Sequence, residues 1–84
     1  MDTPTVGRIV RYVLPPGGEF AGQDRAAIVT GVFNDYLCNL TVFYDQPNDV
    51  VGEQRDDTQM VGRAWSCQFN EEKAPGTWHW PERV

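Results

Sequence analysis

Residues 76–84, GTWHWPERV, decide how this chain closes its fold. They hold two of the three tryptophans and the only histidine, and Pro81 ends any strand that they form. Chain termini usually fray, so this much apolar surface predicts a segment that completes a core or presents an aromatic face to a partner. In a strand, Trp78 and Trp80 point to one side and His79 to the other. We expect the two rings to form a lid over the core in preference to a ligand platform, because each buries about 150–250 Å².

Four further segments have the β-branched and aromatic content of strands, with Pro, Gly, Asn and Asp between them. In the first of them, Val10 and Tyr12 face one way and Ile9 and Arg11 the other. Asn34-Asp35 predicts a tight turn, and hence a hairpin between the second and third strands. The four segments are 6–14 (VGRIVRYVL), 26–33 (AAIVTGVF), 37–44 (LCNLTVFY) and 60–69 (MVGRAWSCQF).

Strict alternation in the fourth segment predicts one shared face for Val61, Arg63, Trp65, Cys67 and Phe69. Residues 50–58, VVGEQRDDT, are mostly polar and predict a loop.

These elements predict an all-β chain and a single domain over residues 1–84. No window of eleven residues has a helical period, and five short strands with unequal loops favour a small five-stranded SH3-like barrel. In such a barrel the last strand, here 77–80, pairs with the first, which removes two exposed edges.

The composition limits the classes of partner that the chain is expected to bind. The net charge is −5, which argues against binding of bulk nucleic acid, but six of the seven basic residues are arginine and suit a small anionic ligand. No apolar run approaches the ~20 residues of a membrane span, and MDTPTVGRIV does not have the pattern of a signal peptide, so we expect a cytoplasmic protein. Cys38 and Cys67 lie in apolar segments and are expected as free thiols. With a single histidine at a distance, they predict neither a metal site nor a cofactor.

The catalytic patterns are weak, so we expect no enzyme. His79 has no recognisable Ser or Asp partner in the sequence, and the acidic pairs at 56–57 and 71–72 are typical of solvated loops. What remains is recognition, because aromatic rings stack on bases and arginine pairs with phosphate, although the same residue types anchor protein–protein interfaces. The candidate ligand-binding residues are Tyr12, Trp78 and Trp80 for stacking, with Arg25 and His79 for phosphate.

The chain resembles, over nearly its full length, a family of short proteins of tailed phages and prophages. The matching stretches are GRIVRYVL at 7–14, RAAIVTGVF at 25–33, NLTVFYDQPND at 39–49 and GTWHWPERV at 76–84, of which the last is the most distinctive. The resemblance implies a phage origin and a role inside an infected host or on a virion.

Residues 7–29, GRIVRYVLPPGGEFAGQDRAAIV, are also similar to the opening of MazF-type toxins, which are ribonucleases with an SH3-like barrel. Arg25 matches a catalytic arginine of those toxins. Ala26 replaces the proline that usually follows it, and the later Arg-Thr or Arg-Ser element has no clear counterpart here. The resemblance supports the fold more than the activity.

Three functions follow as expectations. The first is a phage-encoded sponge that sequesters a cyclic oligonucleotide signal of bacterial immunity in the cytoplasm of the infected host. One small barrel has little room for a pocket of ~300 Å³, so the site is expected between subunits of a homo-oligomer. The alternatives are a virion structural or decoration protein that docks through its aromatic terminus, and a MazF-like ribonuclease.

Overall fold

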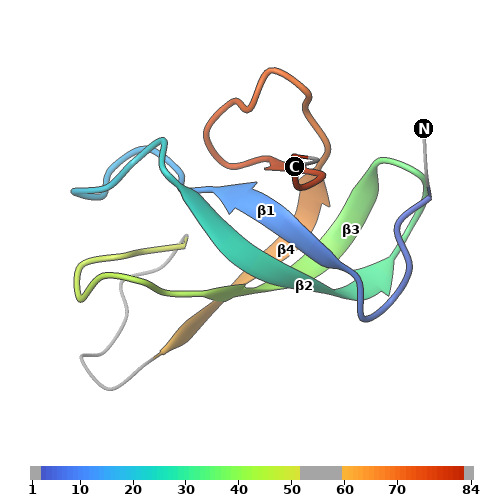
Figure 1. Cartoon of the computed structure of the whole chain (residues 1–84), viewed down its shortest axis with the longest axis horizontal. Coiled ribbons are helices and arrows are strands. Elements are labelled where there is room, and N and C mark those ends of the chain that lie inside the picture. Colours follow the sequence, from blue (N-terminus) through green and yellow to red (C-terminus); the bar gives the residue numbers. More distant parts are fainter. Residues whose placement is uncertain (1–2, 52–59, 83–84) are drawn as a thin grey trace.

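A computed structural model describes residues 3–51 and 60–82 and contains one five-stranded antiparallel sheet (Figure 1). Its strands are β1 (Ile9–Val13), β2 (Asp24–Val32), β3 (Leu37–Phe43), β4 (Val61–Gln68) and β5 (Trp78–His79). The order across the sheet is β4-β3-β2-β1-β5, so the expected all-β, barrel-like fold is confirmed. In the described part of the chain, no helix is long and apolar enough to cross a membrane.

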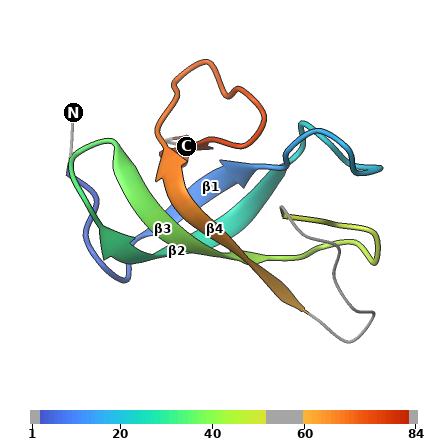
Figure 2. The same ribbon diagram turned by 180° about the vertical axis from the view of Figure 1, so that it is seen from behind.

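The sheet curls into a half-barrel, as the opposite views of Figures 1 and 2 show. β5 pairs with β1, with Arg11 opposite His79 and Tyr12 opposite Trp78. At the other end of the sheet, Phe69 and Trp78 form an isolated parallel bridge. The predicted pairing of the last strand with the first is therefore confirmed, although β5 spans two residues and not the predicted 77–80.

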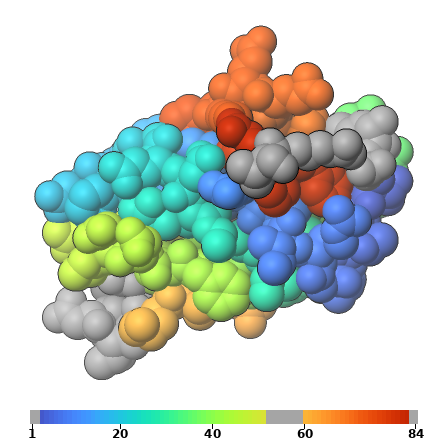
Figure 3. All heavy atoms as spheres, viewed as in Figure 1, coloured from blue at the N-terminus to red at the C-terminus, as the bar shows by residue number. Residues whose placement is uncertain are grey.

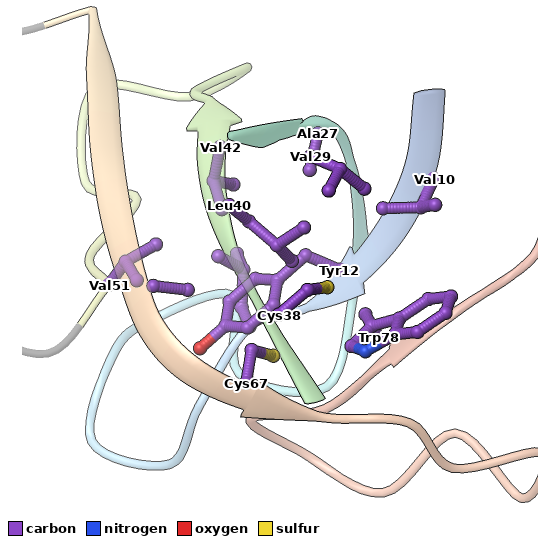
Figure 4. Packing of buried hydrophobic residues seen from close by; sticks show 12 residues of the cluster. Val10, Tyr12, Ala27, Val29, Cys38, Leu40, Val42, Val51, Cys67 and Trp78 are labelled. Atoms are coloured by element: carbon purple, nitrogen blue, oxygen red, sulfur yellow. The ribbon is translucent and has the colours of Figure 1, made fainter. Parts of the chain in front are cut away.

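The core fills the inner face of this curled sheet (Figure 4). Trp78 has no exposed surface, and its indole Nε1 donates a hydrogen bond to the carbonyl of Tyr36 at 3.1 Å. Trp78 is thus the lid that the sequence predicts, with Trp80 against it on the same side. The cluster comprises Val10, Tyr12, Leu14, Ala27, Val29, Cys38, Leu40, Val42, Val51, Ala64, Cys67 and Trp78.

A β-bulge at Ser66 divides β4 into two parts. Odd-numbered side chains point outward before the bulge and into the core after it. Val61 and Trp65 are exposed on the outer face, whereas Cys67 is buried in the core. The register with β3 shifts across this point, Ser66 has a positive φ of 49°, and its amide donates to Asn39 Oδ1 at 2.8 Å. The prediction of a single shared face from Val61 to Phe69 is therefore wrong, because an extra residue at a bulge reverses the alternation.

The described loops agree with the sequence prediction except at the start of β2. The Asn34 side chain accepts from the amides of Tyr36 and Leu37 and forms the predicted turn of the β2–β3 hairpin. β2 begins at Asp24, so Arg25 lies in a strand and not in the predicted loop. Of the loop expected at 50–58, residues 52–58 lie outside the described residues, and the acidic pair at 56–57 lies there with them.

Candidate functional site

Two of the predicted stacking residues, Tyr12 and Trp78, lie inside the core. They are partners across β1 and β5, and their side chains are 4% and 0% exposed. Burial raises the pKa of Tyr12 to about 12, so its phenol stays neutral at physiological pH. Neither ring is at the surface of this chain, where a ligand would meet it.

Arg25 also points to the inner side, at the end of the core, where it binds Asp49. Its Nε and Nη2 atoms donate to the two carboxylate oxygens of Asp49 at 2.6 and 2.9 Å, and its side chain is 7% exposed. Asp49 accepts two more hydrogen bonds, from the amides of Asp45 and Gln46 at 2.8 and 3.0 Å. This Arg25–Asp49 clamp ties the loop after β3 to the start of β2.

The clamp sets the charge states of both partners. Burial works to raise the pKa of Asp49, but the hydrogen bonds from Arg25 and from the Gln46 and Asp45 amides outweigh it and hold the pKa at about 2. The hydrogen bond to Asp49 raises the pKa of Arg25. A phosphate that binds Arg25 has to displace a buried, fully hydrogen-bonded carboxylate.

His79 lies on the outer side of the sheet, opposite Trp78, as the alternation predicts. Its Nε2 atom is 3.2 Å from Asp24 Oδ2, and the contact spans β1, which lies between β2 and β5. The ring is 4% exposed, and Nδ1 is buried without a hydrogen-bond partner among the described residues. Since a carboxylate accepts, we assign the proton of the neutral ring to Nε2, which leaves Nδ1 as an acceptor.

Two pockets flank His79, and together we call them the His79 site. The first, of about 200 Å³, is lined by Arg11, Asp24, His79 and Glu82. The second, of about 160 Å³, is lined by Phe69, Glu71, Lys73, His79 and Trp80. An ion pair between Lys73 Nζ and Glu82 Oε1 at 2.7 Å joins a residue of one pocket to a residue of the other. In Figure 3 the red C-terminal segment lies between the orange loop after β4 and the blue residues of the N-terminal part.

Trp80 gives the site an aromatic face that is half-buried. Its ring meets Trp78 edge-on, with the centroids 5.2 Å apart, and the Arg8 guanidinium lies 4.8 Å from the ring centroid. Its Nε1 is buried without a hydrogen-bond partner in the part of the chain that the structure describes. Of the five predicted residues, only His79 and Trp80 come together at this surface.

The sequence analysis predicts neither the basic residues nor the carboxylates that line the His79 site. The sequence contains a partial signal for Arg11 as a site residue. The alternation of 6–14 places Arg11 on the face opposite Tyr12, and the pairing of the last strand with the first places it beside His79. Lys73 and Asp24 come from a loop and a strand end, and their approach to His79 depends on the curl of the sheet.

The chemistry of the His79 site favours holding a ligand. No serine, threonine or cysteine is among the residues that line the two pockets, so the Asp24–His79 pair has no hydroxyl or thiol beside it there. Within residues 3–51 and 60–82, no three His, Cys, Asp or Glu side chains are placed to hold a metal ion. The two pockets combine aromatic rings, a histidine, two basic side chains (Arg11 and Lys73) and three carboxylates (Asp24, Glu71 and Glu82), with Arg8 over the Trp80 ring beside them.

No family model, no curated protein and no solved structure matches this chain. The resemblances to phage proteins and to MazF-type toxins therefore remain predictions.

Proposed function

We propose that this chain is a small, non-catalytic binding protein that holds a small anionic ligand, such as a nucleotide, at the His79 site. The observation that carries the proposal is the gathering of Arg8, Arg11 and Lys73 around the half-buried ring of Trp80 and the buried His79. An aromatic face stacks on a base, and arginine and lysine donate charged hydrogen bonds to phosphate. Arg11 and Lys73 line the pockets and Arg8 lies over the Trp80 ring, alongside the carboxylates of Asp24, Glu71 and Glu82.

The ligand class that we propose is a cyclic oligonucleotide signal of anti-phage immunity, which the protein sequesters in the cytoplasm of an infected bacterial host. The resemblance to phage proteins supports this setting. Each pocket is smaller than the ~300 Å³ of ordinary small-molecule sites. A cyclic oligonucleotide therefore extends over both pockets or onto a second copy of the chain, which supports a homo-oligomer.

A specific observation favours a second function, that of a virion structural or decoration protein. The outer face of the sheet exposes Ile9 and Trp65 by 62% and 67%, and Phe43 and Val61 by about two fifths each. Single exposed apolar residues are normal, but several on one sheet face are typical of a protein-binding surface.

The MazF-like ribonuclease ranks third. Its only carried-over catalytic residue, Arg25, is held by Asp49 and is nearly buried. Catalysis by Arg25 would require the guanidinium to leave that carboxylate.

A thermal-shift screen against linear and cyclic nucleotides tests the first function. A ligand at 100 times its dissociation constant stabilises by about 2.7 kcal/mol, which raises the melting temperature of a chain this size by several degrees. We expect Arg8→Gln to reduce the shift. Arg63→Gln is the matched control, because Arg63 lies 5.9 Å from the Trp65 ring in a similar pair on the outer face.

The outcomes separate the three functions. A shift lost in Arg63→Gln and kept in Arg8→Gln would move the ligand to the Arg63–Trp65 pair on β4 and contradict the His79 site. A flat response across the panel, with a cooperatively folded protein, would favour the virion component, which mass spectrometry of purified particles then detects. RNA cleavage that Arg25→Lys removes would restore the ribonuclease.

A further inference from the structure

The carboxylate of Glu82 lies among the basic residues of the His79 site. It accepts a hydrogen bond from Lys73 Nζ at 2.7 Å and lines the same pocket as Arg11 and His79. The hydrogen bond from Lys73, and then the positive charges of Lys73 and Arg11, lower the pKa of Glu82. Lys73 belongs to the loop after β4 and Arg11 to β1, so the fold brings two cations from distant segments to one carboxylate.

This internal contact is weak enough to be displaced. The side chains of Lys73 and Glu82 are 42% and 79% exposed. Exposed ion pairs of this kind change an equilibrium by a factor of about five or less, and salt screens them. Arg11, an exposed residue, makes no hydrogen bond or ion pair with any described residue, so its planar set of donors is available.

The geometry points to a phosphate-binding subsite between Lys73 and Arg11, in which Glu82 is a tethered competitor for the ligand. This inference rests on the proposed function and assigns the ligand's charged group to particular residues. A phosphate monoester, such as the terminal group of a linear nucleotide, carries up to two negative charges and three acceptor oxygens, whereas Glu82 and each phosphodiester of a cyclic oligonucleotide carry one charge. A monoester therefore gains more than the carboxylate does from the arginine donors and the lysine ammonium.

Asp24 fixes where in the pocket the phosphate lies. Its carboxylate lines the same pocket and repels an anion, but it is held 3.2 Å from His79 Nε2. The phosphate therefore belongs on the Lys73 side, in the position of the Glu82 carboxylate. The pocket that Lys73 lines also contains the Trp80 ring, which can take a base, and the exposed carboxylate of Glu71.

Titration of the isotope-labelled protein with inorganic phosphate and with AMP, followed by NMR at low ionic strength, tests the competition. We expect Glu82→Gln to bind both probes about three- to tenfold more tightly than the wild type, since it removes the competitor and one like charge. We expect Arg11→Gln and Lys73→Gln to weaken both probes by a similar factor. If AMP binds more tightly than inorganic phosphate to the same variant, the phosphate group that the subsite recognises belongs to a nucleotide.

Glu72→Gln is the matched control, because it removes one negative charge from the same loop as Lys73 at an exposed residue that lines neither pocket. Equal affinities in Glu82→Gln, Glu72→Gln and the wild type would overturn the tethered competitor while leaving the proposed function intact. Absence of any response to either probe, in the wild type and in Glu82→Gln, would overturn the subsite. A thermal shift with a cyclic nucleotide that persisted in Arg11→Gln and Lys73→Gln would keep the proposed function and place the phosphate elsewhere.

Discussion

Arg25 and Asp49 form the most demanding contact in the described part of the chain, because both charges are buried. Removing one partner of a buried ion pair leaves the other charge without compensation and costs about 3–5 kcal/mol. Asp49→Asn keeps the shape and the acceptor oxygen but removes the charge. We expect it to lower the free energy of unfolding by about 3 kcal/mol, measured by urea denaturation.

Asp45→Asn is the matched control for this experiment. Asp45 is an exposed carboxylate in the same loop, where it accepts a hydrogen bond from the Gln46 side chain at 3.1 Å. Its replacement is expected to change stability by no more than about 0.5 kcal/mol. Equal urea midpoints for the two variants would contradict a structural role for the clamp.

At the scale of elements, Gly62 sets how closely β4 packs on the loop after β3. An added Cβ would meet Tyr44 Cζ at 2.8 Å and Val51 Cβ at 3.0 Å, closer than ordinary contacts. Gly62→Ala is therefore expected to lose about 1–3 kcal/mol by overpacking. At Gly31 the nearest atom is 3.4 Å away, so Gly31→Ala in β2 is expected to be neutral or slightly stabilising. If Gly31→Ala had a lower melting temperature than Gly62→Ala, the packing around Gly62 would be looser than these distances indicate.

β5 is short, and Trp78 is its main attachment to the core. Trp78→Ala removes a fully buried ring and one of the two hydrogen bonds that the Tyr36 carbonyl accepts, while the Phe69 amide still donates the other. We expect a loss of about 3–5 kcal/mol, enough to unfold a chain with a thin stability margin, as seen by loss of NMR dispersion. Trp65→Ala, at a ring 67% exposed, is expected to stay folded with a near-native melting temperature. A folded Trp78→Ala variant that only lost ligand binding would instead make Trp78 part of the binding surface.

The sequence predicts the elements better than the arrangement of the site. Period-two patterns depend on local backbone geometry, so strands, the Asn34 turn and the pairing of the first and last strands are all recovered. The reversal of side-chain direction at Ser66 is not recovered, because a bulge adds one residue without a change of composition. The sequence shows no partner for Arg25, because Asp49 is 24 residues away and only the curled sheet brings the two together.

At the scale of the whole molecule, the clamp makes stability depend on acid pH. The pKa of Asp49 is about 2 in the folded chain, below the ~3.9 of an unfolded aspartate. A depressed folded pKa contributes stability above the unfolded pKa, and this contribution of about 2 kcal/mol is lost as the pH falls from about 4 to about 2. The difference in urea midpoint between the wild type and Asp49→Asn should therefore shrink over that range. Parallel pH profiles for the two proteins would contradict the assignment.

The open edge of the sheet leads to the prediction of a homo-oligomer. β4 is last in the order β4-β3-β2-β1-β5, and its bridge to β5 lies at Phe69, beyond the strand. Edge strands with apolar side chains pair with other chains, and β4 exposes Val61 and Trp65. A two-fold axis at Ala64 would place Arg63 of each copy opposite Trp65 of the other, where guanidinium and ring attract each other.

Sedimentation velocity over a range of protein concentrations tests this pairing. We expect a dimer that strengthens with salt, because two copies with a net charge of −5 repel each other at low ionic strength. Trp65→Lys should give a monomer. Ile9→Lys should leave the dimer intact, since Ile9 is 62% exposed on the same face but lies on β1, away from the edge. A wild type that stayed monomeric into the millimolar range would exclude the β4 pairing, and a dimer broken by Ile9→Lys alone would move the interface from the edge to the centre of the outer face.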